Sequence, residues 1–179
     1  MGNLPSVAKA LEVAGAEVDV RPDVDASADA LCVPGQGVFG RCMTSLGDGR
    51  DDAIRDWLAR SRPYLGICLG MQILFDHSEE GGVDGLGVLP GRVTRLQGPV
   101  RVPHIGWNTV AADQGSTYFY FDHSFAVHPS DGGIVKAWCE HGERFAAWIE
   151  KGTLTAVQFH PEKSSRDGIG LLRDWVARL

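Results

Sequence analysis

Apolar residues recur along this chain with two different periods, and the period changes near the middle. In the first half, segments with helical spacing alternate with short apolar runs. Helical spacing is typical of a helix with one buried face, and a short apolar run is typical of a buried strand. The pattern predicts helices over residues 3–14, 39–46 and 51–60, and strands over residues 16–20, 30–33 and 64–67. Asn3 is the expected N-cap of the first helix, with Pro5 in its first turn, and Gly15 ends it.

From residue 92 to residue 159 the pattern changes to strict alternation, which predicts a series of strands. The predicted strands cover residues 93–96, 105–110, 118–121, 125–128, 134–138, 145–149 and 155–159. Turn residues at 97–99, 131–133 and 151–152 indicate hairpins, and residues 79–87 a surface loop. A closing helix has its apolar stripe at residues 172, 175, 176 and 179. No repeat or low-complexity linker divides the chain, so we expect a single α/β domain over residues 1–179 with an antiparallel β excursion.

Composition excludes several classes of function. The net charge of -6, with no basic run, argues against nucleic acid as the main partner. No apolar segment approaches the length of a membrane span, and no signal peptide opens the chain, so we expect no membrane partner. The four cysteines show no paired spacing, which fits a reducing cytoplasm better than a disulfide framework. Cys139 and His141 indicate a hairpin tip beside Gly142 rather than a metal site. We expect no metal ion or cofactor.

The segment around Cys68 carries the most specific chemical signal. An apolar strand pattern runs directly into the predicted start of a helix over residues 69–75, and Gly66 and Gly70 flank Cys68 at a spacing of two residues. This is the thiol counterpart of the G-x-S-x-G nucleophile elbow, whose sharp turn leaves no room for side chains at those two positions. A thiolate at the N-terminus of the helix would be favoured by the helix dipole. Taken alone, Cys68 could equally be a small buried core residue.

Two further segments supply partners for a nucleophile. Pro34 to Gly37 form a glycine-rich loop after a predicted strand, where free backbone N–H groups can face a ligand, although an ordinary turn has the same composition. The last predicted strand leads to His160 and Glu162, whose side chains point to the same side of an extended segment. An isolated pair of this kind is commonly solvent-exposed. Together with an elbow cysteine, it indicates a Cys–His–Glu triad.

Three segments resemble the signature blocks of class I glutamine amidotransferases: residues 66–72, 34–37 and 158–164. Within that family, residues 102–108, 120–125 and 2–7 resemble the glutaminase subunits of imidazole glycerol phosphate synthases. The similarity covers essentially the whole chain. It implies a three-layer α/β fold with an open, mostly parallel sheet, flanking helices and an antiparallel β excursion.

The resemblance also implies roles for single residues. Cys68 would attack the side-chain amide of glutamine, and His160, oriented by Glu162, would move the protons. The implied oxyanion and substrate-binding residues are Gly35, Gln36, Gly37, Leu69, Gln72, Ser124 and Phe125. The backbone N–H of Leu69 and one from the Gly35–Gly37 loop would stabilise the oxyanion.

A partner subunit is implied as well. The freed ammonia would pass to a (β/α)8-barrel cyclase in a cytoplasmic heterodimer, which makes imidazole glycerol phosphate and aminoimidazole carboxamide ribotide in histidine biosynthesis. Trp107, Asn108 and Lys163 would lie at the interface, since Trp is a favoured interface anchor. The alternatives are a core Trp and a solvated Lys.

Departures from the family pattern are confined to positions outside the triad. Relatives usually open with an apolar strand before the Gly-Asn-Leu block, so we expect the first core strand to be missing and the native chain to start upstream of Met1. Gln36 stands where relatives usually carry Val, and Asp122 and Phe125 where they usually carry Val and Tyr. These differences could alter gating of the oxyanion loop and substrate binding.

Three other functions share parts of this pattern. A glutaminase subunit of another synthase, such as those of anthranilate or pyridoxal phosphate formation, would have the same triad. A free-standing cysteine hydrolase or peptidase would share the elbow, and would turn over without a partner. A truncated, non-catalytic regulatory subunit would keep the interface but form no thioester.

Overall fold

The computed structural model describes residues 3–179. It begins with helix α1 (Leu4–Ala14), for which Asn3 is the N-cap and Gly15 the C-cap, as predicted. The carbonyl of Asn3 accepts the backbone N–H groups of Ser6 and Val7. Gly15 has φ 108°, a conformation that glycine adopts without strain.

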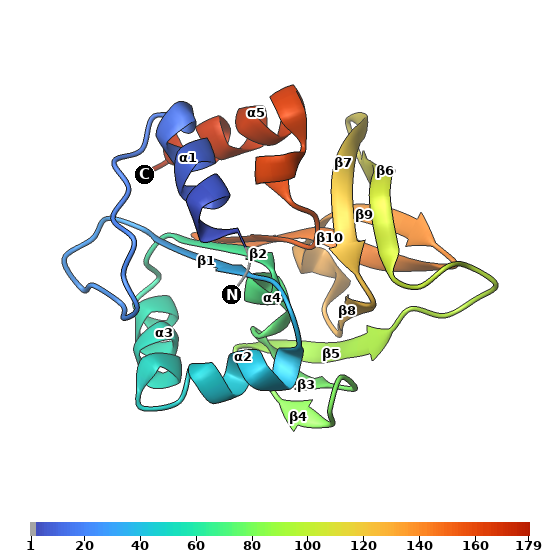
Figure 1. The fold of residues 1–179 in the computed structure, drawn as a ribbon, viewed down its shortest axis with the longest axis horizontal. Helices are drawn as coiled ribbons and strands as arrows, with labels where there is room; N and C mark the ends of the chain where they lie inside the picture. Colours follow the sequence, from blue (N-terminus) through green and yellow to red (C-terminus); the bar gives the residue numbers. More distant parts are fainter. Residues whose placement is uncertain (1–2) are drawn as a thin grey trace.

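The large sheet has seven strands in the order β1-β2-β11-β10-β9-β6-β7 (Figure 1). They are β1 (Leu31–Gly35), β2 (Tyr64–Cys68), β11 (Leu154–Val157), β10 (Glu143–Lys151), β9 (Val135–His141), β6 (His104–Ala112) and β7 (Gly115–His123). The predicted α/β class is confirmed. The expectation of a mostly parallel sheet is wrong, because only β1, β2 and β11 run parallel and the other four strands pair antiparallel. Four antiparallel strands of the predicted excursion are therefore part of the same sheet.

Helices cover both faces of the parallel half (Figure 1). Helix α1 packs with α5 (Ser165–Val176) on one face, and α2 (Phe39–Ser45) and α3 (Arg50–Ala59) lie on the other. Each face has its own apolar core: Phe145, Phe159 and Leu172 are central to one, and Phe39, Trp57 and Tyr64 to the other. The three-layer arrangement follows from these two cores.

A second sheet has four strands in the order β4-β3-β5-β8. They are β3 (Phe75–Ser78), β4 (Val83–Asp84), β5 (Leu89–Arg95) and β8 (Phe125–Pro129). Strand β8 follows β7 after the single residue Ser124, so the chain passes from the large to the small sheet there. The turn at 151–152 forms the predicted hairpin between β10 and β11. The segments at 97–99 and 131–133, by contrast, connect strands of different sheets, the latter around the short helix η1 (Gly132–Ile134).

Two predicted elements differ from the structure. Residues 16–20 form no strand, because no strand of the described residues lies alongside them and β1 is the outermost strand of the sheet. The helix expected over residues 69–75 is the short α4 (Leu69–Gln72), since Phe75 already pairs with Leu89 in the second sheet. The predicted loop at 79–87 contains β4. Among residues 3–179, no helix has the length and apolar character needed to cross a membrane.

Candidate active site

Cys68 lies at the tip of a strained turn between β2 and α4. Its backbone has φ 55° and ψ −106°, a conformation that residues with a side chain rarely adopt. A Cβ at Gly66 would lie 2.5 Å from the Gly70 carbonyl oxygen, and a Cβ at Gly70 would lie 1.8 Å from the Val33 oxygen. The predicted elbow, with glycine required at both flanking positions, is confirmed. The Tyr64 hydroxyl donates to the Gly70 carbonyl at 2.8 Å, and this hydrogen bond helps to fix the turn.

The glycine-rich loop lies beside the elbow because β1 and β2 are parallel neighbours. Gly35 is the register partner of Cys68. A Cβ at Gly35 would lie 2.5 Å from the Cβ of Leu69, so only glycine allows this approach. The loop and the backbone of Leu69 therefore lie on the same side of the nucleophile.

His160 and Glu162 reach the same site from the neighbouring strand β11, the other parallel neighbour of β2. Glu162 belongs to the short helix η2 (Pro161–Lys163). Nδ1 of His160 lies 2.9 Å from Oε1 of Glu162, and the two side chains are 2% and 1% exposed. The backbone N–H of His160 donates to the Tyr120 carbonyl at 2.8 Å, and the Ser164 hydroxyl donates to the His160 carbonyl at 2.6 Å. These contacts fix the backbone of His160 and one nitrogen of its ring.

The electrostatics of the site favour a charged imidazole. Burial alone would lower the pKa of His160, but interaction with Cys68 and with Glu162 outweighs it and raises the pKa to about 9. Nε2 of His160 is buried and has no hydrogen bond to any of residues 3–179, so it can exchange a proton with a bound substrate. Burial raises the pKa of Cys32 and of Cys139 to about 12 and that of Cys42 to about 11. Those three thiols stay protonated at neutral pH and are poor nucleophiles.

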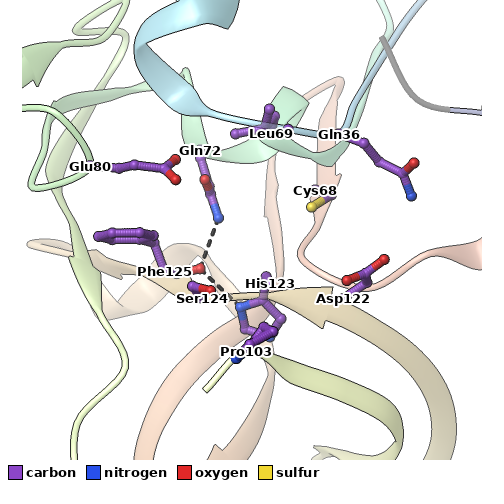
Figure 2. A pocket seen from close by; sticks show the side chains of 11 residues that line it. Gln36, Cys68, Leu69, Gln72, Glu80, Pro103, Asp122, His123, Ser124 and Phe125 are labelled. Atoms are coloured by element: carbon purple, nitrogen blue, oxygen red, sulfur yellow. Dashed lines mark hydrogen bonds between the residues drawn. The ribbon is translucent and has the colours of Figure 1, made fainter.

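A cavity of about 250 Å³ opens at Cys68 (Figure 2). The elbow and the loop form one wall, and the crossing from β7 to β8 forms the other. Its lining residues are Gln36, Gly37, Cys68, Leu69, Gln72, Glu80, Pro103, Asp122, His123, Ser124 and Phe125. All predicted oxyanion and substrate-binding residues line it except Gly35, which lines a smaller adjoining space with His160 and Glu162.

Gln72 connects the far wall of the cavity to the nucleophile. Its Nε2 donates to the Phe125 carbonyl at 2.9 Å and to Oε1 of Gln158 at 3.0 Å. Nε2 of Gln158 in turn donates to Sγ of Cys68 at 3.6 Å. Gln158 is fully buried and was not among the predicted site residues. The signals in the sequence were its place two residues before His160 and its membership of the block formed by residues 158–164.

Glu80 is a second residue that the sequence analysis did not predict. It belongs to the segment interpreted as a surface loop, yet its carboxylate points into the cavity (Figure 2). Oε2 of Glu80 accepts the backbone N–H of Phe39 at 2.7 Å, at the start of α2. Nothing in the local sequence distinguishes Glu80 from Glu79, because its position depends on the fold of the second sheet.

The predicted interface residues lie in different surroundings. Trp107 is 52% exposed on β6, beside Ile105 at 60% and Tyr118 at 62%. Lys163 lies 3.7 Å from Asp122 and over the Tyr120 ring, near the cavity mouth. The side chain of Asn108 is instead engaged inside the chain, with Nδ2 donating to Nε2 of His104 and to the Glu140 carbonyl.

Known proteins resemble this chain over almost its whole length. The family model described as glutamine amidotransferase class-I matches residues 3–179. The imidazole glycerol phosphate synthase subunit HisH of Mycolicibacterium paratuberculosis is 46% identical, over 99% of this chain and 94% of its own. The HisH subunit of Nocardia farcinica is 47% identical, over 99% and 94%. A crystal structure of a glutamine amidotransferase superposes with a TM-score of 0.79 at 21% identity, covering 99% of this chain and 95% of its own. The chain therefore belongs to the class I glutamine amidotransferase family, among the HisH subunits of imidazole glycerol phosphate synthase.

Proposed function

We propose that this chain is the glutaminase subunit of an imidazole glycerol phosphate synthase, which hydrolyses glutamine to glutamate and ammonia for histidine biosynthesis. One observation carries the proposal. The elbow thiol of Cys68, the imidazole of His160 and the buried carboxylate of Glu162 converge beside a cavity of about 250 Å³. The printed name of the relatives, imidazole glycerol phosphate synthase subunit, supports the assignment to that synthase.

The chemistry proceeds through a thioester. The Cys68 thiolate attacks the amide carbon of glutamine, and the negative charge that develops on oxygen is stabilised by the Leu69 N–H and an N–H of the Gly35–Gly37 loop. The His160 imidazolium gives its Nε2 proton to the departing ammonia. Neutral His160 then takes a proton from water, which attacks the thioester and releases glutamate and the thiolate. Glu162 keeps the His160 proton on Nδ1 and stabilises the imidazolium.

The cavity lining suits a free amino acid. Glutamine has an α-ammonium group that requires a buried acceptor, and Glu80 presents a carboxylate to the cavity while its other oxygen is occupied by Phe39. The backbone at Ser124 and Phe125 and the side chain of Gln72 lie between Glu80 and Cys68. We assign the α-ammonium to Glu80 and the central part of glutamine to Gln72, Ser124 and Phe125.

The proposed partner is a (β/α)8-barrel cyclase, bound as a heterodimer in the cytoplasm. The exposed apolar surface formed by Ile105, Trp107 and Tyr118 supports an interface on β6 and β7, because exposed aromatic side chains of this size are typical of binding surfaces. Lys163 lies between that surface and the triad. Ammonia released at Cys68 would enter the barrel there rather than bulk solvent.

The test is glutamate release from glutamine, measured with and without the barrel cyclase and its ribonucleotide ligand. Strong stimulation by the liganded partner is the expected result. Cys68→Ala should abolish glutamine-dependent synthesis but leave ammonia-dependent synthesis by the complex intact. Stimulation by the partner of a different synthase, or glutaminase activity retained in Cys68→Ala, would overturn the proposal.

A further inference from the structure

Two buried histidines face each other at the cavity wall. The antiparallel register of β6 and β7 pairs His104 with His123. The residues are 4% and 6% exposed, and Nδ1 of His104 lies 3.0 Å from Nε2 of His123. Neither residue belongs to the triad, although His123 also lines the cavity. Their contacts determine which nitrogen of each ring carries a proton.

The first constraint comes from the β6 side. Oδ1 of Asn108 accepts the backbone N–H of Thr109 at 2.7 Å, so the amide nitrogen of Asn108 faces the other way. That Nδ2 donates to Nε2 of His104 at 3.2 Å, which makes Nε2 an acceptor. A neutral imidazole that accepts at Nε2 carries its proton on Nδ1. His104 therefore donates from Nδ1 to Nε2 of His123.

The second constraint comes from the cavity side and gives the same direction for the hydrogen bond between the two rings. Nδ1 of His123 lies 2.9 Å from the Phe125 carbonyl oxygen, which can only accept. His123 must therefore carry its proton on Nδ1 and accept at Nε2. A second proton on either ring would set two donors against each other. Burial acts in the same direction, because it lowers the pKa of His104 to about 4 and that of His123 to about 3.

The hydrogen bonds continue from there to the nucleophile. The Phe125 carbonyl also accepts from Nε2 of Gln72, which donates to Gln158, which donates to Sγ of Cys68. We call this set the polar network; its members are Asn108, His104, His123, the Phe125 carbonyl, Gln72, Gln158 and Cys68. Donation runs from Asn108 through His104 and His123 to the Phe125 carbonyl, and from Gln72 through Gln158 to Cys68, so the two halves of the network meet at that carbonyl.

The outer end of the polar network lies directly behind the exposed apolar surface. Trp107 and Asn108 are consecutive residues of β6, and their side chains lie on opposite faces of the strand. His104 is stacked between Phe121, with ring centroids 4.7 Å apart, and His141, at 4.0 Å. A displacement of β6 by anything that binds Trp107 must therefore move Asn108 and the rings that follow.

We propose that His104 and His123 are positioning residues that hold the Phe125 carbonyl, Gln72 and, through Gln158, the Cys68 thiol in the geometry for attack, and that they transmit displacement of β6 to the nucleophile. The second half of this proposal rests on the proposed function, since it assigns β6 to the cyclase interface. The first half requires only the polar network.

The variant that tests the proposal is His104→Phe. Phenylalanine keeps a ring between Phe121 and His141 but removes both nitrogens from the polar network. The matched control is His141→Phe, whose ring stacks on His104 from the other side but whose Nε2 contacts only the Arg101 carbonyl outside the network. In the complex with the cyclase and its ligand, we expect kcat to fall between about 10- and 100-fold in His104→Phe, with a smaller change in KM for glutamine. We expect His141→Phe to retain both parameters.

Two further measurements separate positioning from packing. NMR of the complete chain with isotope-labelled histidine should show both His104 and His123 with the proton on Nδ1, and the His123 signal should change in His104→Phe. The rate of Cys68 alkylation by iodoacetamide, measured without the partner, should change in His104→Phe and not in His141→Phe.

The tests of the positioning role give results that are independent of the test of the proposed function. A proton on Nε2 of either histidine, or equal Cys68 alkylation in wild type and His104→Phe, overturns the positioning role even if the wild type is an active glutaminase. A wild type that hydrolyses no glutamine with the cyclase overturns the proposed function, while the NMR and alkylation results still decide the positioning role. Stimulation by the cyclase that is undiminished in His104→Phe overturns the transmission from β6.

Discussion

Nδ1 of His160 lies 2.9 Å from Oε1 of Glu162, and both side chains are almost completely buried. A carboxylate held at this distance in a site of low dielectric stabilises the protonated ring far more than it would in water. In the part of the chain that the structure describes, no group donates to the second carboxylate oxygen of Glu162, so the interaction with His160 is the main compensation for burying its charge. The pair therefore supplies both the orientation and the proton affinity of the base.

Replacing that carboxylate by an amide should separate the two effects. In Glu162→Gln the side chain keeps its size, but an amide N–H can face Nδ1 and force the His160 proton onto Nε2. We expect kcat for glutamine hydrolysis to fall by about 10²- to 10⁴-fold in the complex. Ammonia-dependent synthesis by the same complex is the control and should be unchanged. A loss below tenfold would remove Glu162 from the triad.

The elbow can be tested by a matched pair of glycine substitutions. Gly70→Ala places a Cβ 1.8 Å from the Val33 oxygen, a backbone atom that cannot move without displacing β1. In Gly170→Ala, in α5, the new Cβ has no described atom within 4 Å apart from its chain neighbours and the backbone of its own helix. We expect Gly70→Ala to lower the free energy of unfolding by about 3 kcal/mol or more, and Gly170→Ala to raise it by about 0.5–1 kcal/mol. Urea denaturation of both variants measures this, and equal stabilities would contradict the close-approach argument.

Much of this site could be predicted from the sequence because its signals are local. The two glycines at a fixed spacing from Cys68 encode the turn by sterics alone, and a Cβ at either position would clash with the backbone in the structure. His160 and Glu162 are two residues apart after a buried strand, so their proximity also needed no long-range information. The three parallel strands then bring these local features to one edge of the sheet.

The incorrect predictions concern features that depend on distant partners. Residues 16–20 alternate as a strand does, but alternation forms a strand only where another strand offers hydrogen bonds. The sequence does not show where the helix ends and the strand begins in the apolar run after Gln72. That boundary depends on the pairing of Phe75 with Leu89, which forms only in the second sheet. Periodicity alone gives the same signal for both.

Site residues were missed for the same reason. His104 and His123 are 19 positions apart and meet only through the register of β6 and β7. Glu80 faces the cavity because β3 and β4 turn its loop back towards α2. Neither the spacing nor the residue type in the sequence could distinguish these side chains from solvated ones.

The buried histidine pair should make stability depend on pH. Burial lowers the pKa of His104 to about 4 and of His123 to about 3, below the value of about 6.5 in an unfolded chain. The unfolded state therefore binds more protons than the folded state below pH 6.5, and the stability contributed by these residues is lost as the pH falls towards 4. We expect the free energy of unfolding to drop by about 2 kcal/mol for each histidine, or about 4 kcal/mol for the pair, between pH 7 and pH 5.

Carboxylates also titrate at low pH, so the comparison must be made between variants. In His104→Phe one of the two rings no longer titrates, and the drop between pH 7 and pH 5 should shrink. His141→Phe should keep the wild-type dependence, because it leaves both buried rings, His104 and His123, in place. Urea denaturation at both pH values gives the three slopes. An identical pH dependence in all three proteins would show that His104 takes up a proton as readily in the folded state as in the unfolded chain.

Substrate recognition by Glu80 gives the final prediction. In Glu80→Gln the amide oxygen can still accept the Phe39 N–H, so the loop and the start of α2 keep their contact, while the negative charge facing the cavity is lost. A hydrogen bond to a charged group contributes about 1.5–3 kcal/mol, which corresponds to a rise in KM for glutamine of roughly 10- to 100-fold. Because the α-ammonium group is remote from the reacting amide, the lost interaction is the same in the ground and transition states, and kcat should change little.

Steady-state kinetics of the complex measure both parameters. The control is Glu79→Gln, since the neighbouring Glu79 accepts the backbone N–H of Arg95 outside the cavity. A fall in kcat without a rise in KM would instead assign Glu80 to the geometry of the Cys68 elbow, and an unchanged KM would place the α-ammonium elsewhere.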